Sequence, residues 1–276
     1  MVTLILQYFL DEGKNCYTRE SMSTHRQLHT ISRGSGPTVI LLHGYLSSGH
    51  YFKSIQKRLA ETHHVIAIDL LGFGKSPKPR ADYTYDDHIT AIHDTIEQLG
   101  VTKPYVLIGH SMGALIALRY TTVFADDVRS LQLFNPPIFS DINQMIETHK
   151  KTGRHYRMML YSPIREGYWK ALKAVPHNRS IRRPEINFAD TVRMSKHARE
   201  GSYKNILGGA QFFSDLRKVT VPTSLIVGRY DRLVYQENLQ TKELPSNIDL
   251  QIVETGHHTL VKNIDLGESL IRQFSS

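Results

Sequence analysis

The sequence contains a single cysteine, Cys16, among its 276 residues. One cysteine excludes an intramolecular disulfide and any zinc site built from several thiolates. The sequence also has no apolar run of about 18 residues, the length that a membrane-spanning helix requires. These absences predict a globular protein of a reducing compartment, and we expect a cytoplasmic location.

The first ten residues are apolar, but the run is short. No lysine or arginine precedes it, and Asp11 and Glu12 follow it. This arrangement is a poor match to a secretory signal peptide. We expect a helix or strand that packs on the body of the protein, with a peripheral foothold on a membrane as the alternative.

Composition and length are those of a folded α/β domain. Hydrophobic residues make up 40% of the chain, enough for a sizeable core, and this excludes wholesale disorder. No segment repeats with a period of 20 to 50 residues, which excludes solenoids and propellers. The length suits one domain, or one core with a large insertion.

Short apolar runs alternate with segments of helical periodicity. Continuous apolar runs of this kind are typical of parallel strands that are buried on both faces. Residues 25–32 suggest additional antiparallel edge strands, and residues 264–274 predict a C-terminal helix. The predicted buried strands are 39–42, 65–68, 105–108, 131–134, 224–227 and 249–253. The fold class predicted is α/β, with a mostly parallel, doubly wound sheet.

The alternation stops between residues 135 and 213. This segment has no short buried strand, and it mixes methionine and aromatic residues with many charges. It predicts a helical insertion, or cap, in a core made of residues 1–134 and 214–276. Residues 150–204 hold 14 basic and four acidic residues, whereas the whole chain carries a net charge of +8. The positive charge is therefore concentrated in the insertion.

A nucleophile motif follows the third predicted strand. Gly109-His-Ser111-Met-Gly113 has the G-x-S-x-G pattern, between a buried strand and a helix. A sharp turn there projects a serine hydroxyl from the carboxyl edge of the sheet, and glycines leave room for the turn. The helix that follows directs its first amides at negative charge developing on the substrate. Ser111 is therefore the predicted nucleophile.

Two further polar residues follow later strands and complete a catalytic triad. A serine hydroxyl needs a histidine base, and that base needs a carboxylate to orient it. Asp231 comes just after strand 224–227, and His257 just after strand 249–253. The order Ser111, Asp231, His257 is the one expected for this motif. His258 competes with His257, and the residue directly after Gly256 is preferred.

The backbone amides of Tyr45 and Met112 are the predicted oxyanion donors. Tyr45 lies in the loop after the first buried strand, where Gly44 lets the backbone approach the substrate. Met112 directly follows the nucleophile. His43, in the same loop, is interpreted as structural.

Neither a cofactor nor a metal is predicted. Gly74-Lys-Ser76 resembles the end of a phosphate-binding loop, but Asp69 stands where that motif requires glycine. The segment is therefore interpreted as a structural loop. His25 and His29 have helical spacing but fall in a predicted strand region.

Together these motifs resemble the α/β-hydrolase family over nearly the whole chain. The resemblance rests on His43-Gly44, Asp69 to Ser76, the Ser111 motif, Asp231 and Gly256-His257. It implies the esterase-like branch, with a helical cap inserted after the sixth strand of the family fold. Dehalogenases and epoxide hydrolases of the family use an aspartate nucleophile, and Ser111 argues against both. Ala114 departs from relatives that carry a second glycine there.

The leading hypothesis is a serine hydrolase that cleaves carboxylic esters of small or medium acyl groups (EC 3.1.1) through an acyl-enzyme. The same triad also serves carbon–carbon bond hydrolases, thioesterases and acyltransferases in similar capped enzymes. A basic cap would favour an anionic substrate, or weak contact with an anionic surface. A ligand receptor on a hydrolase fold is a further alternative. Nucleic-acid binding is not expected, because no reading module is recognisable.

Overall fold

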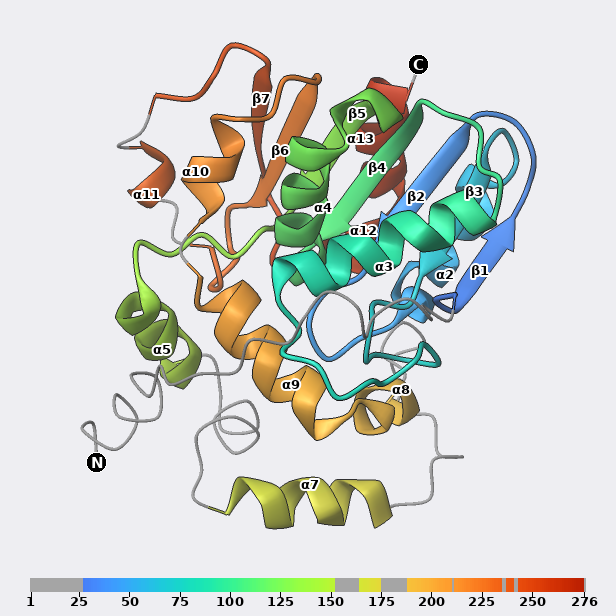
Figure 1. The fold of residues 1–276 in the computed structure, drawn as a ribbon. Helices are drawn as coiled ribbons and strands as arrows, with labels where there is room; N and C mark the ends of the chain where they lie inside the picture. The colour runs from blue at the N-terminus through green and yellow to red at the C-terminus, as the bar shows by residue number, and fades with distance from the viewer. Residues whose placement is uncertain are drawn as a thin grey trace.

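A seven-stranded sheet runs through the centre of the computed structural model (Figure 1). The structure describes residues 27–151, 164–174, 188–209, 211–234, 237–240 and 243–275. The strand order is β1-β3-β2-β4-β5-β6-β7, and only β1 is antiparallel to its neighbour. The strands are β1 Thr30–Arg33, β2 Thr38–Leu42, β3 His64–Ile68, β4 Tyr105–His110, β5 Val128–Phe134, β6 Thr223–Gly228 and β7 Ile248–Val253. The predicted α/β class and mostly parallel sheet are confirmed.

Three of the central strands are buried along their whole length, as their apolar runs predicted. Every residue of β2, β4 and β6 is buried, because helices cover both faces of the sheet. Segment 249–253 forms a strand, β7, but its predicted burial is wrong: β7 lies at the edge of the sheet, none of its six residues is fully buried and two are exposed. The predicted antiparallel edge strand is β1, which pairs with β3 from Thr30 opposite Ile68 to Arg33 opposite Val65.

Helices on the two faces build two separate cores. On one face α3 (Tyr85–Gln98), α4 (Met112–Val123) and α10 (Phe212–Leu216) pack together. On the other face α2 (Lys53–Leu59), α12 (Thr259–Lys262) and α13 (Ile264–Ser275) pack together. Successive residues of β2 point to opposite cores, with Ile40 in the first and Leu41 in the second. Helix α3 begins earlier than its apolar periodicity indicates, because Thr84 and Asp87 form a capping box.

The chain between β5 and β6 is helical in its described parts. Helices α5 (Ile142–Lys151), α7 (Arg165–Ala174), α8 (Phe188–Arg193) and α9 (Lys196–Ser202) lie beyond the carboxyl ends of the parallel strands (Figure 1). A π-helical turn, η4 (Tyr203–Leu207), continues α9. Ser48 donates to Asp190 of α8 at 2.6 Å, and Tyr45 donates to the carbonyl of Arg199 in α9 at 2.8 Å. The loop after β2 is thereby tied to the helices above it.

The described part of the chain also contains the short elements η2 (Gly49–Phe52), η3 (Ala125–Asp127) and α11 (Glu237–Gln240). Within the ranges that the structure describes, no helix has both the length and the apolar character needed to cross a bilayer. The predicted apolar segment 1–10 and Cys16 lie outside the described residues. So do several of the basic and aromatic residues of the predicted insertion, those at 152–163 and 175–187.

Candidate active site

Ser111 stands on a strained turn between β4 and α4. Its φ of 55° and ψ of −124° are unusual for a residue with a side chain. Its amide donates to the carbonyl of Phe134 at 2.9 Å, which holds the turn against β5. A Cβ on Gly113 would lie 2.2 Å from the carbonyl oxygen of Leu42, so the first turn of α4 can approach β2 only with glycine there. This is the sharp strand–turn–helix connection that the G-x-S-x-G pattern predicted.

The structure brings Ser111, Asp231 and His257 into one hydrogen-bonded chain. His257 Nδ1 lies 2.7 Å from Asp231 Oδ2, and His257 Nε2 lies 3.0 Å from Ser111 Oγ. Because a carboxylate only accepts, Nδ1 carries the ring proton and Nε2 is left to accept from the serine hydroxyl. All three side chains are mostly buried, and Ser111 is 6% exposed. The arrangement has the geometry of a nucleophile with an oriented base.

The adjacent histidines 257 and 258 point in different directions. His258 Nδ1 accepts from the hydroxyl of Tyr51 at 3.4 Å, whereas His257 faces Ser111 and Asp231. Of the two histidines left open by the sequence, His257 is therefore the one in reach of the serine.

Asn135 contacts the site, although the sequence analysis placed it only at the start of the insertion. It is fully buried, and its φ of 50° is a backbone conformation that asparagine tolerates. Its Nδ2 donates to Asp231 Oδ2 at 2.9 Å, and its Oδ1 accepts from Thr259 Oγ1 at 3.0 Å. The side chain thus fixes the oxygen that faces His257. The available signal was its position, directly after a buried strand at the carboxyl edge.

The loop after β2 lies against the serine. A Cβ on Gly44 would approach Ser111 Cβ to 2.9 Å, so this backbone passes directly beside the nucleophile. His43 holds the loop, because its Nδ1 donates to the carbonyl of Gly44 at 2.8 Å and its Nε2 accepts from Leu70 N at 2.9 Å. Burial lowers the pKa of His43, which keeps the ring neutral. These contacts fit the structural role predicted for His43.

The two predicted oxyanion donors belong to the backbone segments that border Ser111. Tyr45 follows Gly44 in the loop. Met112 is the first residue of α4, and an amide in that position has no acceptor within its own helix.

Four rings form an aromatic arch across the end of β4: Tyr45, Tyr203, His149 and Phe139. Tyr45 and Tyr203 have ring centroids 5.9 Å apart, and Phe139 meets His149 edge-on at 5.6 Å. His149 Nδ1 lies 3.0 Å from the Tyr203 hydroxyl. Tyr45 lies in the loop after β2, and Phe139 lies in the loop after β5. Strand β4, which leads to Ser111, lies between β2 and β5, so the row of rings from Tyr45 to Phe139 crosses the end of β4. The sequence analysis had singled out neither His149 nor Tyr203.

The methionine and tryptophan that stood out in the insertion have packing roles. Met145 of α5 is fully buried, and Trp169 of α7 lies under the guanidinium of Arg199, 4.6 Å from its ring centroid. Arg199 also donates to Glu166 at 2.7 Å. Trp169 therefore joins α7 to α9.

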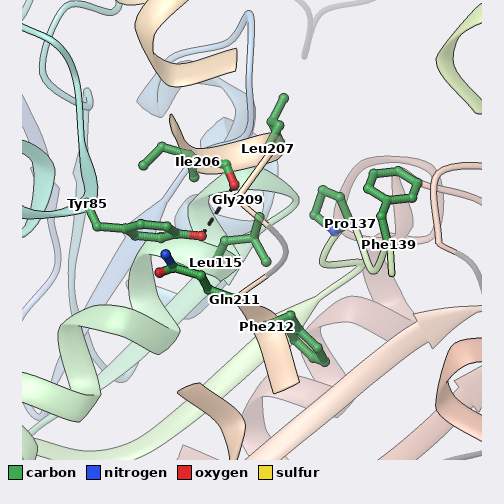
Figure 2. A pocket seen from close by; sticks show the side chains of 9 residues that line it. All are labelled: Tyr85, Leu115, Pro137, Phe139, Ile206, Leu207, Gly209, Gln211 and Phe212. Carbon is green, nitrogen blue, oxygen red and sulfur yellow. Dashed lines mark hydrogen bonds between the residues drawn. The ribbon is translucent and has the colours of Figure 1, made fainter. Parts of the chain in front are cut away.

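A small cavity lies beside the first turns of α4 (Figure 2). Its volume of about 10 Å³ is room for one water molecule, not for an acyl group. The Tyr85 hydroxyl donates to the carbonyl of Ile206 at 3.4 Å at one side of it. It is lined by Tyr85, Leu115, Pro137, Phe139, Ile206, Leu207, Gly209, Gln211 and Phe212. Phe139 connects this cavity to the aromatic arch.

The loop from Asp69 to Ser76 is built around the Asp69 carboxylate. That carboxylate accepts from Gly49 N at 2.6 Å, from Lys75 N at 2.8 Å and from His29 Nδ1 at 3.0 Å. A phosphate-binding loop would direct such amides at a ligand, whereas here they bond an aspartate of the chain itself. These bonds fit the structural role that the sequence predicted for the loop.

Among the described residues, His93, Glu97 and Asp127 have potential metal-ligand atoms close together. The Lys103 ammonium pairs with both acids, at 3.0 Å from Asp127 Oδ2. The Lys103 cation thus offsets one of the two carboxylate charges of this cluster, in which Glu97 is exposed and His93 and Asp127 are partly buried.

Buried histidines predict a loss of stability in acid. Burial lowers the pKa of His88 to about 3 and that of His149 to about 4, from 6.5. As the pH falls below 6.5, the unfolded chain binds these protons before the folded chain does, so the free energy of unfolding decreases down to the folded pKa values. We expect the melting temperature to fall between about pH 6.5 and pH 4. The replacement His88→Gln should flatten this decline in a series of thermal melts, and an unchanged slope would contradict it.

Comparison with known proteins gives one family. A family model described as the α/β hydrolase fold matches residues 37–263. A probable lysophospholipase of Arabidopsis thaliana, BODYGUARD 4, is 45% identical over 140 residues, which cover 47% of this chain and 31% of that protein. A second plant relative, BODYGUARD 5, is matched over 27% of its length. The alignments thus span about a third or less of these two proteins.

Other relatives match over most of their length. The 2-hydroxy-6-oxo-6-(2'-aminophenyl)hexa-2,4-dienoic acid hydrolase of Metapseudomonas resinovorans is 28% identical over 215 residues, covering 74% of this chain and 71% of that protein. The structure of an esterase from Exiguobacterium antarcticum superposes with a TM-score of 0.70 at 24% identity, covering 90% of this chain and 96% of that one. At this identity the structural likeness establishes the fold.

Proposed function

The chain belongs to the α/β-hydrolase family, and we propose that it is a serine hydrolase that cleaves carboxylic esters of small or medium acyl groups through an acyl-enzyme. The observation that carries this proposal is the chain of two hydrogen bonds from Asp231 through His257 to Ser111, of 2.7 Å and 3.0 Å. It gives a buried hydroxyl a base within reach, at a strained turn.

In the first half of the reaction, Ser111 Oγ attacks the acyl carbon of the ester. His257 Nε2 takes the hydroxyl proton, and Asp231 stabilises the imidazolium that results. The amides of Tyr45 and Met112 donate to the oxyanion of the tetrahedral intermediate. The carbon–oxygen bond then breaks, and His257 returns the proton to the leaving alcohol. Ser111 is left acylated.

In the second half, a water molecule attacks the acyl carbon and gives a proton to His257. The second tetrahedral intermediate collapses with departure of Ser111 Oγ, which regains the proton from His257. The products are a carboxylic acid and the free enzyme. Every proton passes through His257 Nε2, so the orientation of this one ring governs both halves.

We assign the insertion, residues 135–213, the role of a cap that excludes water and binds the acyl group. The aromatic arch supports an uncharged acyl group. Burial lowers the pKa of His149 to about 4, so the polar group in the middle of the arch is neutral near pH 7. An apolar or planar acyl chain gains from contact with such rings, whereas a carboxylate would lose hydration there without gaining a cation.

A carbon–carbon bond hydrolase is the second candidate. It is favoured by the 28% identity to the dienoic acid hydrolase over 74% of this chain. The same triad would then act on an anionic dienoate, and the basic residues of the insertion would attract it. Thioester hydrolysis and acyl transfer use the same acyl-enzyme and differ only in the leaving group or the acceptor.

The test is a fluorophosphonate probe with mass spectrometry, followed by rates on p-nitrophenyl esters from acetate to palmitate. A stoichiometric adduct on Ser111 with turnover of short or medium esters is the expected result. An adduct without ester turnover, together with cleavage of a dienoate ring-fission product, would transfer the proposal to the second candidate. No adduct on the folded protein would overturn both and favour a ligand receptor.

A further inference from the structure

We propose that His110, the residue before the nucleophile, is a positioning residue that holds the backbone of His257 in place for the reaction. This inference rests on the proposed function, because it concerns the orientation of the same base. The observation behind it is a hydrogen bond of 2.7 Å between His110 Nε2 and the carbonyl oxygen of His257. Nothing in the G-x-S-x-G pattern requires this side chain, since its middle positions are open.

The bond determines the tautomer of His110. A carbonyl oxygen only accepts, so Nε2 carries the proton and donates it. Nδ1 is then a bare acceptor, and it has no hydrogen-bond partner among the described residues. It faces the backbone of Gly44, where a Cβ would come within 3.2 Å of it. The His110 side chain, 2% exposed, therefore lies between the His257 loop and the oxyanion loop.

Tyr51 prevents the His110 ring from turning. The two rings stack with centroids 4.4 Å apart and an angle of 17° between their planes. The Tyr51 oxygen lies 3.1 Å from His110 Nε2, and its hydroxyl donates to His258 Nδ1 at 3.4 Å. Each of the two adjacent histidines, 257 and 258, is thus bonded to the same His110–Tyr51 pair.

The position of this contact explains why it matters. Strands β4 and β7 are separated by β5 and β6, so no ladder of sheet hydrogen bonds joins the Ser111 turn directly to the His257 loop. His110 makes that connection with one side chain, since Ser111 is its chain neighbour. A displacement of about 1 Å in such a site can cost about 100-fold in rate. A direct bond between the two loops limits that displacement.

The electrostatics of His110 agree with this role. Burial holds the pKa of His110 well below 6.5, and the nearby His257 and His258 lower it further. The ring therefore stays neutral while His257 accepts the serine proton. A second cation beside the His257 imidazolium would oppose that transfer.

The test compares His110→Phe with His110→Gln. Phenylalanine keeps the stack on Tyr51 but has no donor, whereas glutamine has an amide donor of similar reach. We expect His110→Phe to lower kcat for the best p-nitrophenyl ester about 10- to 100-fold with little change in KM, and His110→Gln to recover most of the loss. His88→Phe, which also removes a buried histidine, is the matched control and should retain the wild-type kcat.

Proton NMR gives a readout that needs no substrate. The Nδ1 proton of His257, held against Asp231, should give a low-field resonance that broadens or disappears in His110→Phe and returns in His110→Gln. Equal kcat in the two variants, a loss confined to KM, or an unchanged resonance in His110→Phe would each overturn the proposal. If the proposed function fails, wild-type protein gives no adduct at Ser111, and the resonance still reports on His110. Should His110→Phe not fold, His110→Asn, with a side chain too short to reach, takes its place under the same criteria.

Discussion

Replacement of Ser111 by alanine is expected to lower kcat for ester hydrolysis about 10⁶-fold and to abolish the fluorophosphonate adduct. The reason is that His257 and Asp231 act only by activating this one hydroxyl, so without it the triad is lost as a unit. Alanine keeps the Cβ and therefore the same backbone strain at φ 55°. The melting temperature should therefore stay close to that of the wild type. Initial rates test the loss of kcat, intact-mass spectra test the loss of the adduct, and thermal melts of both proteins test the unchanged melting temperature.

The matched control is Ser224→Ala. Ser224 is a fully buried serine of β6 whose Oγ has no hydrogen-bond partner within the described part of the chain. Its removal should leave activity unchanged and the melting temperature no lower. A third variant, Ser111→Gly, relieves the strain and should gain about 1 kcal/mol in free energy of unfolding. Residual activity of Ser111→Ala above a tenth of the wild type would remove Ser111 from the mechanism.

The fold was predictable because its main signals are local. The strands β2, β3 and β4 contain continuous apolar runs, and each predicted run corresponds to one strand of the sheet. The strand order was not predictable, because it depends on which runs pair across long crossovers. The start of α3 at Tyr85 depends on the side-chain cap of Thr84, which hydrophobic periodicity does not report.

The candidate site also has residues that could be predicted from the local sequence and residues that could not. Ser111, Asp231 and His257 each follow a recognisable strand, and so their meeting at one sheet edge could be expected. Asn135 also directly follows a predicted strand, but no motif marks it as a site residue, and His149 lies in the insertion away from any predicted strand. Asn135 acts on a residue 96 positions away, and the partner of His149, Tyr203, is 54 positions away. Their contacts depend on how the insertion folds back over the sheet, which residue spacing does not encode.

Replacement of Asp231 by asparagine is expected to lower kcat about 10⁴-fold through a reversed tautomer of His257. Three donors face the carboxylate: Leu233 N at 2.8 Å from Oδ1, and His257 Nδ1 and Asn135 Nδ2 on Oδ2. An asparagine offers one acceptor and one amino group. The two ways of placing them have different consequences.

If the amino group of the new asparagine faced Leu233, two N–H groups would oppose each other, and a backbone amide cannot turn away. If the amino group faces His257 instead, the His257 ring can move its proton to Nε2, so that Nδ1 accepts from the asparagine. Asn135 can then reverse its amide and present its oxygen to the same amino group, while the Thr259 hydroxyl rotates to accept from the reversed amide. In the second arrangement every donor and acceptor around residue 231 has a hydrogen-bond partner, so we expect it to be the more stable one. Its consequence is an Nε2 that carries a proton and cannot accept one from Ser111.

The measurement is kcat for Asp231→Asn together with ¹⁵N NMR of the His257 ring, which distinguishes the two tautomers. The control is Asp215→Asn, which alters an equally buried carboxylate that pairs with Arg119 at 2.8 Å. It should lower the melting temperature and leave kcat within about two-fold, because it removes an ion pair remote from His257. A large loss in Asp231→Asn with the proton still on Nδ1 would mean that the charge of Asp231, not its control of the tautomer, dominates. A loss below ten-fold would mean that Asp231 is not the partner of the base.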